Sequence, residues 1–214
     1  MFKFIKSDSN TSYLCVLGVL KTELGIQIRD EMLEWLLKYY HVILCEQEPP
    51  GILFEWPALF CAQDISIRYN IPVLYLHTKG AANPNQRYSQ VNVRTLWADE
   101  FGQKRDDYMR AVNTDTPTIA CPIIGTQLKI TWWNGFIANP NAFKSISLNE
   151  PSPNRYIYEC LWQYSDVNVY GGITSSYNKH DGTDKFSAVA FINAYTNMSK
   201  RNEIISYWHN NAMN

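Results

Sequence analysis

Three short apolar runs alternate with two amphipathic stretches over the first 80 residues, and this succession limits the fold more than any other feature. Residues 12–20, 41–45 and 71–76 are rich in residues that favour β-structure, which predicts buried strands. Residues 23–40 and 56–69 repeat apolar side chains at helical spacing. Apolar strands separated by amphipathic helices predict an α/β fold, with a mostly parallel sheet covered on both faces.

The rest of the chain has weaker patterns. We expect a helix over residues 93–112, a strand over 131–138 and a helix from Asn154 to about Tyr164. Over residues 186–208 we expect a strand or a helix, followed by a closing helix. The length of 214 residues fits one domain, residues 1–214.

Composition excludes several classes of protein. Hydrophobic residues make up 46% of the chain, which is too many for a disordered protein. With 19 Lys and Arg against 20 Asp and Glu, the net charge of −1 offers no basic excess for nucleic acid. No apolar stretch approaches the roughly 20 residues of a membrane span, and the N-terminus turns polar too early for a signal peptide. The five cysteines contain no CxxC pair, so we expect free thiols and a cytoplasmic location.

The segment from His77 to Gly80, HTKG, ends the third predicted strand. In parallel sheets ligands bind at the carboxyl ends of the strands. The imidazole of His77, the hydroxyl of Thr78, the ammonium of Lys79 and the backbone N–H of Gly80 together suit a diphosphate. The alternative is an ordinary strand end with a solvated lysine and a turn glycine.

Two further segments offer groups for a sugar. Gly135 interrupts an apolar stretch that includes Trp133, and such a glycine often allows a ligand or a backbone to approach closely. Asn134 beside it can hydrogen-bond sugar hydroxyls. Arg155 and Glu159 are four residues apart on the predicted helix, where Glu159 can bind an acceptor hydroxyl or act as a base. The alternatives are a buried strand with a bulge and a surface ion pair.

Metal ligands are sparse. The sequence has no DxD motif, and its only acid-x-acid triplet places Glu46 and Glu48 after the second predicted strand. His180, in a polar loop, is a possible metal or phosphate ligand, although such a histidine is commonly just exposed. A divalent cation such as Mn²⁺ or Mg²⁺ is therefore possible and not required. Dinucleotide, Walker A, serine-hydrolase and zinc-protease motifs are absent.

Taken in order, LYLHTKG, a helix bearing Trp97, TWWNGFIANPNAF and RYIYECLW resemble a glycosyltransferase family of bacteria and large algal DNA viruses. Members of that family have a strand ending in HTKG and a later Trp-rich strand followed by R-Y-x-x-E. The resemblance covers about residues 40–165, more than half of the chain. The compact layout is most similar to the domain that algal viruses use on capsid glycans.

The resemblance implies a single GT-A-like, Rossmann-like domain that transfers a sugar, most simply from a UDP-sugar, to a glycan or glycoprotein. The nucleotide-binding half would be about residues 1–112, and residues 113–214 would bind sugar and acceptor. Leu17, Gly18 and Val19 would contact the nucleoside, and WNGFIAN would line the sugar site. A viral member would act in the host cytoplasm.

Two other functions remain open from the sequence. One is a non-catalytic α/β domain that binds glycans or nucleotides. The other is a phosphate-ester hydrolase or nucleotidyltransferase that uses the same diphosphate pocket.

Overall fold

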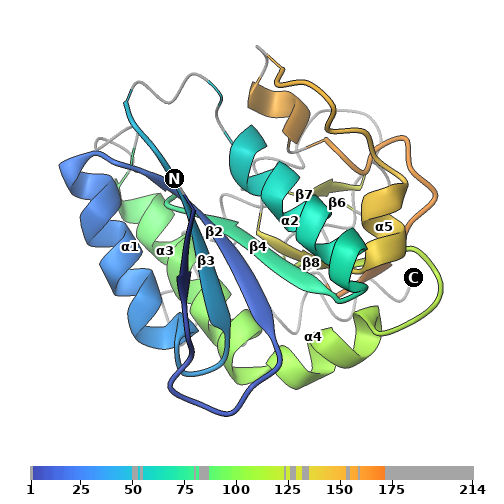
Figure 1. The fold of residues 1–214 in the computed structure, drawn as a ribbon, viewed down its shortest axis with the longest axis horizontal. Coiled ribbons are helices and arrows are strands. Elements are labelled where there is room, and N and C mark those ends of the chain that lie inside the picture. The colour runs from blue at the N-terminus through green and yellow to red at the C-terminus, as the bar shows by residue number, and fades with distance from the viewer. Residues whose placement is uncertain are drawn as a thin grey trace.

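A mixed α/β architecture is seen in the computed structural model (Figure 1). The structure describes residues 2–49, 53, 55–79, 81, 87–122, 124–125, 129–131, 135–152, 155–158 and 160–171. Over these residues a sheet of seven strands has the order β1-β3-β2-β4-β8-β5-β9. None of the helices in this part of the chain is long and apolar enough to cross a membrane.

The centre of the first half is parallel. Strands β3 (His41–Gln47) and β4 (Val73–His77) both pair in parallel with β2 (Leu14–Leu20), which lies between them. Every residue of β2 and β4 except the last is buried, whereas in β3 only Val42, Leu44 and Cys45 are. At the edge, β1 (Phe2–Ile5) is exposed and pairs antiparallel with β3.

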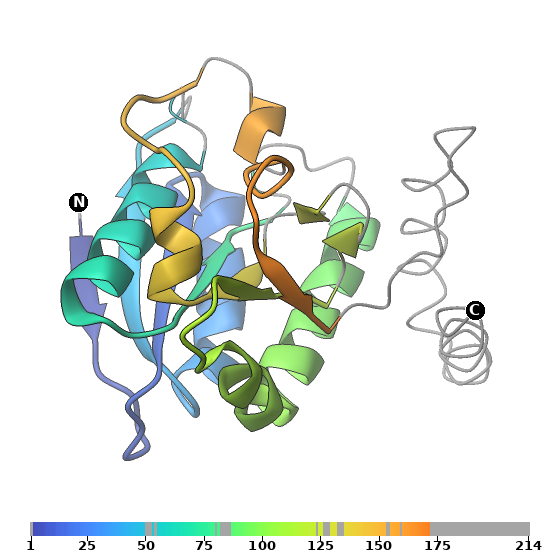
Figure 2. The same ribbon diagram turned by 90° about the vertical axis from the view of Figure 1, so that its right-hand side faces the viewer.

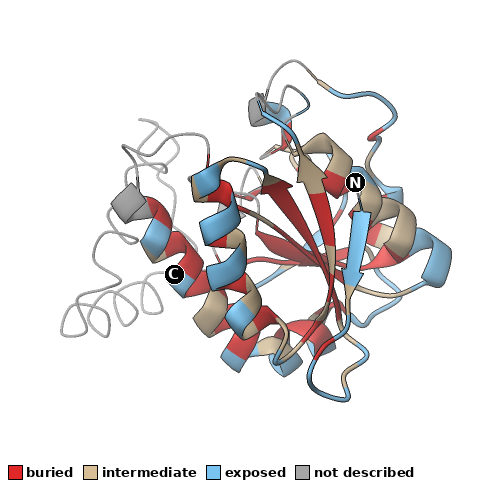
Figure 3. Cartoon of the chain, turned by 60° about the vertical axis from the view of Figure 1, so that its left-hand side comes forward, coloured by how far each residue is buried: buried red, intermediate tan, exposed pale blue. Residues whose placement is uncertain are grey.

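Helices cover both faces of this sheet (Figures 1 and 2). Buried side chains of three helices pack on one face: α1 (Glu23–Leu36), α3 (Arg87–Trp97) and α4 (Arg105–Val112). The π-helix η2 (Ala98–Gln103) connects α3 to α4. On the other face lie α2 (Trp56–Tyr69) and α5 (Pro140–Lys144). Figure 3 shows the buried strands between helices whose outer sides are exposed.

Strands in the second half are short. β8 (Phe136–Ala138) lies between β4 and β5 (Thr118–Ala120) and is antiparallel to both. β9 (Asn168–Tyr170) adds in parallel to β5. β6 (Ile124–Gly125) and β7 (Ile130–Thr131) form a separate two-stranded sheet.

The predictions for the first half are confirmed, with shifted ends. The helix expected over 56–69 has those bounds, because Pro57 favours its first turn and Asn70 ends it in the left-handed conformation. The helix expected over 23–40 ends at Leu36. The helical stretch over 93–112 is found, but it begins at Arg87 and contains the π-helix.

Two predictions for the second half are wrong. The single strand over 131–138 is instead β7 and β8, which belong to different sheets. The helix expected from Asn154 gives only a 3₁₀ helix, η4 (Arg155–Tyr158), followed by turns. The segment 186–208 lies outside the described residues.

Candidate functional site

The carboxyl ends of β2 and β4 meet where the direction of the crossover connections reverses. The connection after β2 places α1 on one face and leads to β3, whereas α2 packs on the other face and leads to β4 on the opposite side of β2. In open α/β sheets ligands bind in the crevice at such a switch point. His77, Thr78 and Lys79 stand there, at what we call the β4 end.

The β4 end is held by hydrogen bonds to neighbouring elements. The Thr78 amide donates to the Gly18 carbonyl at 2.8 Å, and the Thr78 hydroxyl accepts from the Leu20 amide at 3.2 Å. From α3, the Arg94 guanidinium donates to the Lys79 carbonyl at 2.9 Å. The segment therefore follows the end of β2 and is fixed in place by α3.

Two cations are buried at this point. Lys79 and Arg94 are each only 7% exposed. A second nitrogen of Arg94 lies 3.3 Å from a carboxylate oxygen of Glu31 on α1. Buried cations are rare without anionic or hydrogen-bonding partners. A solvated lysine at an ordinary strand end, the alternative left open by the sequence, is not what the structure has.

His77 has an acidic neighbour that sequence reasoning missed. Its Nε2 lies 3.9 Å from Oε1 of Glu55, and both side chains are 13% exposed. The ring also makes an edge contact with Trp97, with centroids 5.9 Å apart. Glu55 comes just before α2, in a segment with no motif, and only the packing of α2 against the sheet brings it to His77.

Tyr75 and Tyr158 are buried on the same side of the sheet as α2. Burial, and after it the nearby Glu55 carboxylate, raises the pKa of Tyr75 well above its ordinary value. Burial also raises the pKa of Tyr158, and Glu55 adds to the increase. Among the atoms that the structure describes, the buried Tyr75 hydroxyl has no hydrogen-bond partner. It remains protonated at neutral pH, so it is a hydrogen-bond donor beside Glu55.

The candidates on β2 divide between the two faces of the sheet. Leu17 and Val19 are 0% and 1% exposed and belong to the core beneath α1, so their side chains serve packing. On the other face, a Cβ at Gly18 would lie 3.1 Å from the Cβ of Ala58 and 3.4 Å from that of His77. Gly18 therefore allows α2 and His77 to pack closely.

Gly135 also has a structural explanation. A Cβ at this position would lie 2.3 Å from Nε1 of Trp97. The close approach that the glycine allows is thus made by the indole of Trp97 rather than by a ligand. Gly80, Trp133 and Asn134 lie outside the described residues.

The pairing expected for Arg155 and Glu159 required an α-helix. Residues 155–158 form a 3₁₀ helix, in which side chains three residues apart share a face, so the i,i+4 argument no longer applies. Neither Glu159 nor the side chain of Arg155 is among the described groups. His180 also lies outside the described residues.

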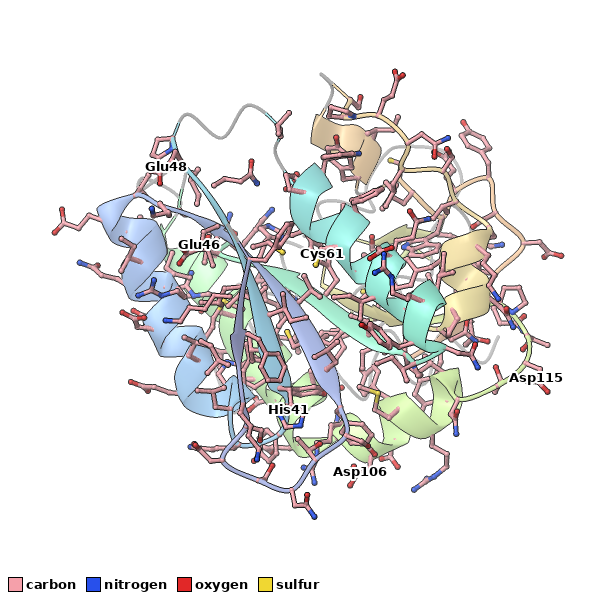
Figure 4. The ribbon with its side chains drawn as sticks, in the orientation of Figure 1. His41, Glu46, Glu48, Cys61, Asp106 and Asp115 are labelled. Atoms are coloured by element: carbon pink, nitrogen blue, oxygen red, sulfur yellow. The ribbon has the colours of Figure 1, made fainter. Side chains whose placement is uncertain are left out.

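Glu46 and Glu48, which Figure 4 labels, each form an ion pair with a basic side chain. Arg29 lies 3.3 Å from Glu46, whose side chain is 14% exposed, and the exposed Glu48 pairs with Lys21. Over the described part of the chain no three His, Cys, Asp or Glu side chains gather closely enough to hold a metal ion.

Comparison of the chain with known protein families, with curated proteins and with solved structures finds no match.

Proposed function

We propose that this protein is a GT-A-like glycosyltransferase that binds a nucleotide-sugar, most simply a UDP-sugar, at the carboxyl ends of β2 and β4. The observation that carries the proposal is the position of His77, Thr78 and Lys79 at the switch point of the sheet, with Lys79 and Arg94 buried beside it. A mixed sheet with a parallel centre, covered by helices on both faces, supports the same assignment.

Lys79 has the central role in this proposal. A nucleoside diphosphate gains negative charge as it leaves the sugar, and a fixed cation in a partly dry site stabilises that charge. Lys79 supplies this cation, and Arg94 positions it through the bond to the Lys79 carbonyl. Because Glu46 and Glu48 already pair with Arg29 and Lys21, no step is assigned to a metal held by them.

His77 and Glu55 supply polar groups at the β4 end, on the side of the sheet that α2 covers. The Glu55 carboxylate lies 3.9 Å from Nε2 of His77, and an imidazole N–H can donate to a phosphate or sugar oxygen. Glu159 stays in the proposal as the group that binds or deprotonates an acceptor hydroxyl of a glycan or glycoprotein. Glu159→Gln would then lower turnover and leave nucleotide affinity nearly unchanged.

The test is a thermal-shift panel of UDP, UDP-sugars and simple phosphate esters, each with and without Mn²⁺. A ligand at 100 times its dissociation constant should stabilise the fold by about 2.7 kcal/mol. We expect UDP and at least one UDP-sugar to raise the melting temperature, and Mn²⁺ to increase the effect through the phosphates.

Hydrolysis of the same compounds by the purified protein separates the other functions. Release of UDP from a UDP-sugar supports a transferase, because such enzymes transfer slowly to water. Binding without any release indicates a non-catalytic domain, and turnover of phosphate esters alone indicates a hydrolase. If no nucleoside diphosphate at millimolar concentration changes the melting temperature, the donor site is not at the β4 end.

A further inference from the structure

Gln90, on α3, has a buried side-chain oxygen without a hydrogen-bond partner. The residue is 7% exposed, and its Oε1 is closed off from solvent and accepts no hydrogen bond from any group that the structure describes. Buried polar atoms are nearly always hydrogen-bonded, and an unpaired one lowers the stability of the fold. A buried acceptor of this kind therefore indicates a partner from outside the described part of the chain.

The turn of α3 that carries Gln90 faces the β4 end. Arg94 lies four residues further along, so the two side chains are neighbours on one face of the helix. The Arg94 guanidinium donates to the Lys79 carbonyl at 2.9 Å, which turns this face of α3 toward the β4 end. Gln90 therefore lies about 6 Å along the helix axis from the residue that holds Lys79.

The same side of the β4 end is covered by α1. Arg94 lies 3.3 Å from Glu31 of α1, and α1 and α3 both pack on this face of the sheet (Figure 1). The chain after β4 is tied to the start of α1, because the Thr22 hydroxyl donates to the Ala81 carbonyl at 3.4 Å. Gln90 is thus on the side that α1 and α3 cover, opposite to the side that α2 covers.

The surroundings of Gln90 suit a flat group with apolar faces and a polar edge. Ala81 and Val93, on the same side, are 6% and 0% exposed and belong to the apolar core. A nucleobase has apolar faces and carries its N–H and carbonyl groups at the edge, whereas a ribose has hydroxyls that each require a partner. A single carboxamide among apolar side chains therefore fits a base better than a ribose.

We propose that Gln90 binds the nucleobase of the donor, by accepting a hydrogen bond from the uracil N3–H of a UDP-sugar. The inference rests on the proposed function, because it takes the diphosphate to lie at Lys79. The carboxamide also has an NH₂ group, which can donate to the uracil carbonyl beside N3. The nucleoside contact expected from Leu17 and Val19 is then made from α3, since those two side chains are in the core.

The experiment measures three affinities by isothermal titration calorimetry on the full chain: those of UDP, of N3-methyl-UDP and of inorganic pyrophosphate. N3-methyl-UDP differs from UDP only by a methyl group in place of the N3 hydrogen. The wild type should bind it about 10-fold or more weakly than UDP, because the Gln90 oxygen loses its donor and meets a methyl group. Pyrophosphate has no base and reports on the phosphate site alone.

Gln90→Leu removes the acceptor and keeps a side chain of similar size. It should bind UDP about 3–10-fold more weakly than the wild type, discriminate less against N3-methyl-UDP, and bind pyrophosphate as the wild type does. The melting temperature of the unliganded variant should not fall, because an apolar side chain replaces an unpaired polar one. A purely structural glutamine would show the opposite, a lower melting temperature and an unchanged preference for UDP. Gln27→Leu, at an exposed position of α1, is the matched control and should leave all three affinities unchanged.

Failure of this inference differs from failure of the proposed function. If the wild type binds UDP and N3-methyl-UDP equally well, Gln90 does not contact the base, and the donor site itself stands. Equal losses of UDP and pyrophosphate affinity in Gln90→Leu would mean that the glutamine supports the phosphate site, which also overturns the inference. If UDP does not bind the wild type, the proposed function fails and this inference fails with it. The affinities of the wild type decide even if the variant does not fold.

Discussion

The two halves of the sheet are held together in different ways. In the parallel half β2 and β3 have seven residues each and β4 has five, so that backbone ladders and apolar side chains determine the structure. In the second half β5, β8 and β9 have three residues each. There, individual polar side chains replace the missing ladder bonds.

Asn139 is the clearest example of such a side chain. Its amide oxygen accepts from the amides of Thr118 and Ala142, at 3.1 and 2.8 Å. Its amide nitrogen donates to the carbonyls of Thr114 and Thr116, at 3.0 and 2.7 Å. One buried residue thus caps α5 and also fixes the chain that leads into β5. In the parallel half the corresponding task, capping α1, falls to Thr22 through a single bond to the Gly25 amide.

The largest effect should be a loss of turnover on substitution of Lys79 in the parallel half. Lys79→Ala should lower turnover of a UDP-sugar by roughly 10²–10³, the usual result of removing one preorganised charge-stabilising donor. Lys79→Arg should not restore full activity, because a planar guanidinium does not replace a compact ammonium. Steady-state kinetics, with the melting temperature checked for each variant, make the measurement.

The control for that variant lies in the other half. Lys144→Ala removes an exposed lysine that bonds only to Asn141 among the groups described, and turnover should not change. Equal losses of turnover in Lys79→Ala and Lys144→Ala would contradict a catalytic role specific to Lys79.

A smaller but still large effect should come from Asn139. Asn139→Ala leaves up to four backbone groups without their partner, at least two of them buried, and should lower the free energy of unfolding by about 2–4 kcal/mol. Urea denaturation should show a lower midpoint with an unchanged slope. Asn141→Ala, which removes two exposed bonds, one to the Asp115 carbonyl and one from Lys144, should cost at most about 0.5 kcal/mol. Similar losses for the two would show that the network is not what holds this half.

The smallest effect should come from Thr22. Thr22→Ala removes the cap of α1 and should cost about 1 kcal/mol by the same urea measurement. Thr95→Ala, on the exposed side of α3, should stay within about 0.5 kcal/mol of the wild type. A loss at Thr22 as large as that at Asn139 would remove the contrast between the two halves.

The same contrast explains what the sequence could predict. Strands β2, β3 and β4 each contain a continuous apolar run, and α2 has a proline at its start, so local patterns suffice for them. Strands of two or three residues carry no period. The apolar run that includes Thr131 and Phe136 gave no sign that it divides between two sheets.

Local sequence patterns also determined which residues of the candidate site could be predicted. His77, Thr78 and Lys79 could be placed from the sequence because they directly follow a strand that is easy to recognise. Glu55 and Arg94 could not be placed, because they reach the β4 end only through the packing of α2 and α3. The sequence also could not show that Gly135 makes room for Trp97, because the two residues are 38 positions apart in the chain.

The position of β8 has a consequence for how the chain is made. During synthesis the three parallel strands are complete once residue 77 has left the ribosome, yet the partner on the free side of β4 arrives about 60 residues later. Until then Val73, Leu74 and Tyr75 form an open, apolar edge, which is the kind of surface that pairs with other chains. A chain interrupted before residue 136 would keep that edge and aggregate. The short strand β8 is thus the element that covers this apolar edge in the folded chain.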